Sequence, residues 1–157
     1  MLYFVIFAAI LLLDVATKLW AVSALQPVSG IPILEGVFHL TYVENRGAAF
    51  GLFQDGRMFF IVITIVLLSL IIFGLKKFEV RSKTLSTGLV FVSAGAVGNL
   101  IDRIFRGFVV DFFDFCLIDF PVFNVADVFV CVGAGLVIMF IIFFEGDAKG
   151  KKDLKDV

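Results

Sequence analysis

PVFNVADVFVCVGAGLVIMFIIFF, from Pro121 to Phe144, is one of the longest apolar segments of this chain. From Phe123 onward it holds one charged residue, Asp127. A helix of this length, rising about 1.5 Å per residue, crosses a hydrocarbon core that is roughly 30 Å thick. We therefore predict a transmembrane helix over residues 123–144 with an aspartate in its first turn.

Three further apolar blocks of similar length precede this one, at residues 2–24, 58–75 and 85–101. The whole chain is 61% hydrophobic and 17% charged, whereas a soluble domain is about half apolar and about a quarter charged. The sequence therefore predicts an integral membrane protein that is mostly α-helical, with four transmembrane helices in a single membrane domain over residues 1–157.

The basic residues favour one orientation of these helices. Residues 76–84, which join the second and third blocks, and the tail at 145–157 together carry eight Lys and Arg residues, whereas the loops at 25–57 and 102–121 carry four. Because cytoplasmic loops are enriched in Lys and Arg, we expect both termini in the cytoplasm and the two less basic loops on the outer face of the membrane.

The first outer loop contains a segment that is typical of a short β-strand or hairpin. GVFHLTYVE, at residues 36–44, alternates with period two and is rich in β-branched and aromatic residues. Its backbone needs a partner at the membrane interface, and residues 109–113 of the second outer loop can supply one. We expect a small outer β-cradle followed by a short surface helix or turn in GAAFGLF, at residues 47–53.

Ionisable residues within apolar helices are costly and often mark a functional site. Asp14 and Lys18 are four residues apart on one helical face, which predicts an ion pair whose lysine extends outward along the helix. The third block ends in GAVGNLIDR, where Asn99 and Arg103 share a face and Asp102 lies beside them. These side chains can either join helices or serve a site, and the segment does not decide between the two.

Two further acids belong to the same outer face. In GFVVDFFDF, alternation wedges Asp111 among apolar neighbours, and burial of this kind raises a carboxyl pKa toward the range of a general acid. Asn124 and Asp127 have the spacing of a helix N-cap and an acid three residues later, and capping can account for both. Two carboxylates that share one proton can also activate water against a carbonyl, as in aspartic peptidases.

Other chemistries lack the residues that they need. His39 is the only histidine, and the chain has neither an HExxH nor a GxSxG motif. Cys116 and Cys131 lack CxxC spacing, so we predict neither a disulfide nor a metal site. The net charge of −1 and the absence of a basic arm argue against nucleic acid as a partner.

Taken in order along the chain, these motifs resemble those of the lipoprotein signal peptidases, or signal peptidase II, which are bacterial plasma-membrane aspartic endopeptidases. The resemblance covers nearly the whole chain. It is carried by Asp14 with Lys18, NRGAAFG (45–51), GNLIDR (98–103), VVDF (109–112) and FNVAD (123–127). The first motif of the family commonly has Gln after its aspartate, where this chain has Val15.

The resemblance implies that Asp111 and Asp127 are the catalytic dyad and that Asp14 and Lys18 support the site. It also implies a substrate, a prolipoprotein cleaved just before a cysteine that carries a diacylglyceryl group. No cofactor or metal is implied, and we expect a monomer in contact with membrane lipids. The residues that the resemblance assigns to lining and bracing the substrate site are Asn45, Gly47, Asn99, Asp102, Arg103 and Asn124.

Two other classes of protein fit part of the pattern. A small proton-coupled transporter or channel subunit also places acids and an Asp–Lys pair in membrane helices. Its acids would lie at several depths, and transporters often contain internal repeats, whereas here the acids share one face and no repeat is evident. A scaffold protein whose polar side chains only join helices is the third class, and it would tolerate Asp→Asn substitutions.

Overall fold

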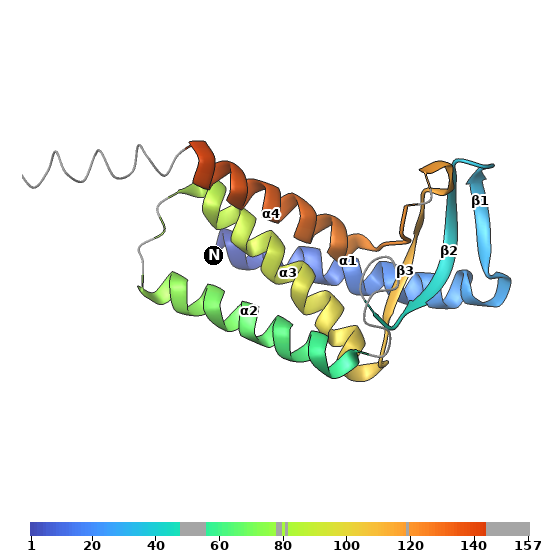
Figure 1. The fold of residues 1–157 in the computed structure, drawn as a ribbon, viewed down its shortest axis with the longest axis horizontal. Helices are drawn as coiled ribbons and strands as arrows, with labels where there is room; N and C mark the ends of the chain where they lie inside the picture. The colour runs from blue at the N-terminus through green and yellow to red at the C-terminus, as the bar shows by residue number, and fades with distance from the viewer. Residues whose placement is uncertain (48–55, 78–79, 81, 119, 144–157) are drawn as a thin grey trace, which may run out of the picture.

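The computed structural model describes residues 1–47, 56–77, 80, 82–118 and 120–143. Helices run along most of the molecule, and a small sheet lies at the end opposite the N-terminus (Figure 1). The helices are α1 (Leu2–Ala24), α2 (Arg57–Lys77), α3 (Lys83–Phe105) and α4 (Val125–Phe143). The strands are β1 (Gly30–Leu34), β2 (Phe38–Asn45) and β3 (Val109–Asp114).

All four of these helices are long and apolar enough to cross a membrane, which confirms the predicted fold class. The largest difference from the predicted bounds is in α3, which continues four residues beyond residue 101. Two carbonyl oxygens in the last turn of α3 have a hydrogen-bond donor, since the Arg57 guanidinium donates to those of Arg103 and Ile104 at 2.8 and 2.9 Å. Helix α4 begins later than predicted, at Val125, because Asn124 caps it.

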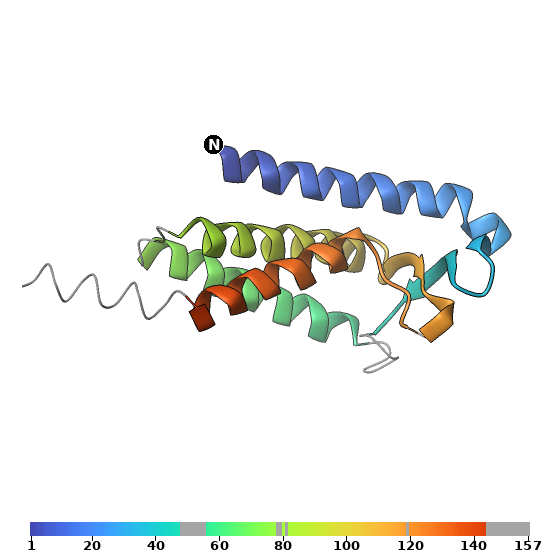
Figure 2. The ribbon, with the colours of Figure 1, turned by 90° about the horizontal axis from the view of Figure 1, so that it is seen from above.

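Helix α3 lies between α1 and α2 and packs closely against α4 (Figure 2). Two glycines allow this close approach. A Cβ atom added at Gly88 would lie 2.8 Å from the Gly133 carbonyl oxygen, and one added at Gly133 would lie 2.7 Å from the Gly88 carbonyl oxygen. Small residues at a helix contact of this kind are common in membranes, because they let the backbones pack directly.

We expect Gly133→Ala to lower the free energy of unfolding by about 1–3 kcal/mol, because the added methyl group overlaps backbone atoms of α3. The matched control is Gly135→Ala in the same helix, where an added Cβ has no atom within 4 Å. Denaturation by SDS in mixed micelles measures both changes. Equal effects of the two substitutions would contradict the proposed role of the contact.

The sheet has the order β1-β2-β3, and both strand pairs are antiparallel. The predicted strand and its predicted pairing with residues 109–113 are therefore confirmed, with Val43 opposite Asp111. Buried apolar side chains from the end of α1 and its C-cap, from β3 and from the start of α4 pack together and join the sheet to the helices. They are Ala21, Leu25, Val110, Phe112 and Val125. The surface helix or turn predicted at residues 47–53 lies outside the described residues, apart from Gly47.

Candidate active site

The first turn of α4 fixes the position of Asp127. The Asn124 side-chain oxygen accepts the Asp127 backbone N–H at 3.0 Å, and Asp127 Oδ2 accepts the Asn124 backbone N–H at 3.1 Å. This reciprocal pair is a capping box, so the predicted cap is confirmed. The other carboxylate oxygen, Oδ1, accepts a hydrogen bond from the Asn99 amide at 2.7 Å. Capping therefore uses one oxygen of Asp127 and leaves the other directed toward α3.

The second aspartate, Asp111, lies in the middle of β3, and only 1% of its surface is exposed to solvent. The Asn45 amide donates to Oδ2 at 2.8 Å, and the Asn124 amide donates to Oδ1 at 2.6 Å. Burial, followed by the negative charge of Asp127, raises the pKa of Asp111 to about 7, although the two amide hydrogen bonds oppose this shift. The buried acid predicted from alternation is therefore confirmed.

The side chain of Asn124 connects the two aspartates. Its oxygen accepts from the Asp127 backbone, while its amide nitrogen lies 2.6 Å from Asp111 Oδ1 and 3.1 Å from Asn99 Oδ1. Asn124 is completely buried, so these hydrogen bonds are sheltered from water. One residue thus sets the position of both carboxylates relative to each other.

A buried ionic cluster supports this arrangement from within the helices. Lys18 Nζ lies 2.9 Å from Asp14 Oδ2 and 3.4 Å from Asp102 Oδ2, and it donates to Asn99 Oδ1 at 2.8 Å. The ion pair predicted between Asp14 and Lys18 is confirmed, but the prediction that the lysine extends outward is wrong. Lys18 is 2% exposed, because Asn99 and Asp102 supply acceptors on the inner side of α1.

The same cluster ties α1 to α4 and α3 to β3. Asp14 Oδ1 accepts the Ala126 backbone N–H at 2.9 Å, and Asp102 Oδ2 accepts the Val110 backbone N–H at 3.1 Å. Sequence reasoning missed Arg106, whose guanidinium pairs with Asp102 Oδ1 at 3.0 Å. The four-residue spacing of Asp102 and Arg106 within a helix was the signal that could have found it.

Arg103 links the end of α3 to the segment that follows β2. Its guanidinium donates to the Gly47 carbonyl oxygen at 3.3 Å and lies 4.9 Å from the centre of the Phe60 ring. The Gly47 backbone N–H in turn donates to the Asn45 side chain at 3.0 Å. The structure therefore brings all ten residues singled out from the sequence into one connected group of polar contacts.

The family described as Signal peptidase (SPase) II matches residues 6–143 of the chain. The chain belongs to the signal peptidase II family. The lipoprotein signal peptidase of Clostridioides difficile is 45% identical over 151 residues, which cover 95% of this chain and 100% of that protein. The lipoprotein signal peptidase of Halothermothrix orenii is 48% identical over 139 residues, which cover 88% of this chain and 93% of that protein.

Two solved structures of bacterial membrane enzymes share the fold of this chain. A bacterial membrane enzyme determined by the in meso method is 29% identical and has a TM-score of 0.81, covering 89% of this chain and 87% of that one. A second structure of this kind is 28% identical, has a TM-score of 0.80 and covers 90% and 93% of the two chains. This chain is therefore a membrane peptidase, as the motifs predicted, and the transporter and scaffold alternatives are not supported.

Proposed function

We propose that this signal peptidase II family member removes the signal peptide from diacylglyceryl-modified prolipoproteins, using Asp111 and Asp127 as a catalytic dyad. The observation that carries the proposal is that Asn124 forms hydrogen bonds with both carboxylates. This contact lies at the end of the helical bundle where the sheet is located. The names of the related lipoprotein signal peptidases support the choice of substrate.

The dyad can cleave a peptide bond with one shared proton and one water molecule. The ionised carboxylate takes a proton from the water, whose oxygen attacks the scissile carbonyl carbon, while the protonated carboxyl gives its proton to the carbonyl oxygen. The resulting neutral gem-diol collapses as its carbon–nitrogen bond breaks. The amine leaves with the proton that one carboxylate took from water, and a hydroxyl of the diol gives its proton to the other carboxylate, which restores the singly protonated dyad. The dyad holds this one proton between its two carboxyl groups.

The position of the dyad suits a substrate that remains anchored in lipid. Asp111 is on the sheet and Asp127 is in the first turn of a membrane-spanning helix, so the pair lies near the boundary between hydrocarbon and water. Acyl chains can stay in the bilayer while the peptide next to the lipidated cysteine reaches the acids. We place this end on the outer face of the bacterial plasma membrane, because the opposite end carries Lys76, Lys77 and Lys83.

The test is a gel-shift assay with detergent-purified protein, a diacylglyceryl-modified prolipoprotein and the same prolipoprotein without lipid. We expect a shortened, lipid-bearing product from the modified substrate only, with the new N-terminus at the modified cysteine. A folded preparation that cleaves neither substrate would contradict the proposed function. Cleavage of both substrates at equal rates would contradict the requirement for the lipid.

The cleavage rate should fall as the pH rises above about 7. Burial and the charge of Asp127 raise the pKa of Asp111 to about 7, so the shared proton is held below this pH and lost above it. The Asn45 hydrogen bond favours the ionised form of Asp111, so Asn45→Ala should move the fall in rate to higher pH. Profiles of kcat/KM against pH for both proteins measure the shift. A rate that keeps rising above pH 8, or an unmoved profile in the variant, would contradict this assignment.

A further inference from the structure

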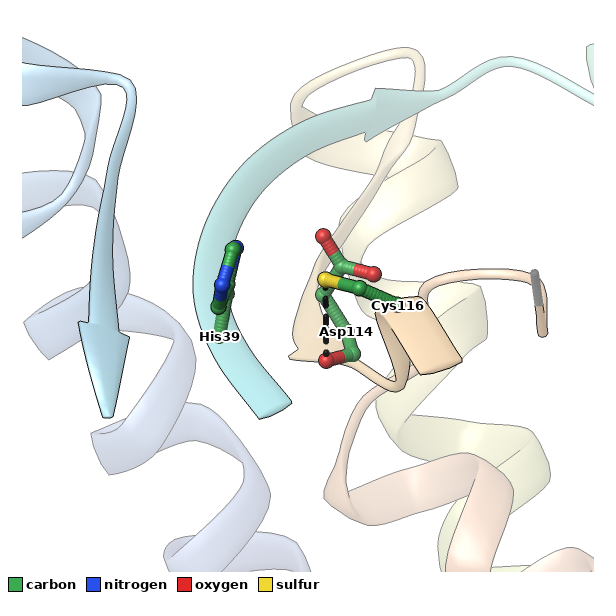
Figure 3. A group of neighbouring side chains, drawn as sticks. All are labelled: His39, Asp114 and Cys116. Carbon is green, nitrogen blue, oxygen red and sulfur yellow. Dashed lines mark hydrogen bonds between the residues drawn. The ribbon is translucent and has the colours of Figure 1, made fainter. Parts of the chain in front are cut away.

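A second group of chemically active side chains lies on the sheet, apart from the dyad. A ring nitrogen of His39, a carboxylate oxygen of Asp114 and the thiol sulfur of Cys116 all lie within 4.8 Å of one another. Figure 3 shows the His39 side chain on β2 opposite the Asp114 carboxylate and the Cys116 thiol. Asp114 is three residues beyond Asp111 on β3, or about 10 Å along the strand, and takes no part in the contacts of the dyad.

We propose that His39, Asp114 and Cys116 form a binding site for a single zinc-class divalent metal ion. Imidazole nitrogen, thiolate sulfur and carboxylate oxygen are the three kinds of protein ligand that zinc takes, and a mixed set of three leaves a fourth position for water. The site stands independently of the proposed peptidase function, because it shares no residue with the dyad or its supporting cluster.

The three ligands belong to three backbone elements that hydrogen bonds hold together. His39 and Asp114 are register partners in the antiparallel β2–β3 pair, so the pairing of the strands brings them together. Cys116 begins a short 3₁₀ helix, η3 (Cys116–Ile118), which is tied to the turn before β2 by a 3.4 Å hydrogen bond from the Leu117 N–H to the Val37 carbonyl oxygen. A metal ion at this point would join β2, β3 and η3.

The distances suit metal binding after a small movement of the side chains. With zinc bonds of about 2.0–2.3 Å, neighbouring ligand atoms of a tetrahedral site lie roughly 3.3–3.8 Å apart, so the widest separation must close by about 1 Å. The Thr41 hydroxyl donates to Asp114 Oδ2 at 2.8 Å and holds the carboxylate, as an outer partner of a metal ligand does. Within the described part of the chain, the His39 ring has a single long hydrogen bond, 3.4 Å from the Gly36 N–H to Nε2, so the ring can turn.

The same three residue types can also form a nucleophilic thiol with its base, but the contacts argue against that arrangement. The Cys116 thiol is directed at the Asp114 backbone carbonyl oxygen, at 3.8 Å. Its hydrogen bond with His39 is to the backbone, and none joins it to the imidazole ring among the described residues. A thiol whose proton faces a carbonyl is not activated by a base. In metal binding, the thiol releases this proton to the solvent as the sulfur–metal bond forms.

The test uses the full chain in detergent, purified without a polyhistidine tag, with its thiols reduced and Co²⁺ as the probe. We expect one equivalent of Co²⁺ to produce the near-ultraviolet band of a cobalt–thiolate bond and Zn²⁺ to abolish the band by displacement. Cys131→Ser, which removes the other free cysteine, should keep the band, whereas Cys116→Ser should lose it. His39→Gln should weaken Co²⁺ binding by more than about tenfold.

Thermal unfolding gives a second readout that does not depend on cobalt. Zn²⁺ should raise the Tm of the Cys131→Ser protein increasingly with concentration, and it should not raise the Tm of the Cys116→Ser protein. Absence of a cobalt–thiolate band in the wild-type protein would overturn the proposal. So would a band that survives in Cys116→Ser or disappears in Cys131→Ser, because the ion would then be bound elsewhere.

Discussion

Asp127→Asn should reduce the cleavage of a lipid-modified prolipoprotein by about 10³-fold or more. An amide cannot exchange the proton that the dyad needs, and general acid–base catalysis of this kind contributes about 10²–10⁴-fold. The asparagine is nearly the same size, and its one side-chain oxygen can still accept the hydrogen bond from the Asn124 backbone. Only the bond that Asn99 donates to the other oxygen is lost, so the fold should survive. Asp111→Asn should cause a loss of similar size, and the double variant should be little worse than either single one, because the two acids act as a unit.

The matched control for the dyad variants is Glu35→Gln, which removes an exposed carboxylate from the turn between β1 and β2. Its initial cleavage rate should equal that of the wild type at the same concentration of enzyme and substrate. A loss of less than about tenfold in either aspartate variant, with Glu35→Gln unchanged, would contradict the assignment of the dyad.

Lys18→Met should lower the free energy of unfolding by about 3–5 kcal/mol, the cost of leaving one member of a buried ion pair without its partner. The completely buried Asp14 would lose the ammonium that lies 2.9 Å from its carboxylate, whereas Asp102 would keep Arg106. Denaturation by SDS in mixed micelles gives the difference. Lys76→Met, which replaces an exposed lysine in the last turn of α2, is the control and should change little.

A double variant separates the charge from the packing at this position. Asp14→Asn removes the buried negative charge and keeps an oxygen for the Ala126 N–H, so the combination with Lys18→Met should recover most of the lost stability. A double variant as unstable as Lys18→Met would indicate that the lysine acts through packing. A single variant as stable as wild type would contradict the role of the buried ion pair.

The sequence predicted those features that depend on neighbours along the chain. Hydropathy located the four helices, alternation predicted the burial of Asp111, and spacing predicted the cap formed by Asn124 and Asp127. Each of these patterns follows from the period of a helix or a strand. The pairing of strand β2 with residues 109–113 was also predicted, whereas the pairing of β2 with β1 on its other side was not.

Features that depend on the packing of distant segments could not be predicted in the same way. The amide of Asn124 reaches Asp111 and Asn99 only because β3, α3 and α4 converge, and Lys18 turns inward because α3 offers Asn99 and Asp102. The proximity of His39, Asp114 and Cys116 follows from the register of two strands that are far apart in sequence. Cysteine spacing therefore gave no indication of a metal site there.

The capping box at Asn124 has a consequence for how the enzyme would lose activity on heating. The hydrogen bonds that start α4 also orient the Asp127 carboxylate. Fraying of that single turn would therefore abolish catalysis while the helical bundle stays folded. Loss of peptidase activity on heating should then report local unfolding at the start of α4. It would report an opening of a few residues at temperatures where circular dichroism still records a fully helical protein.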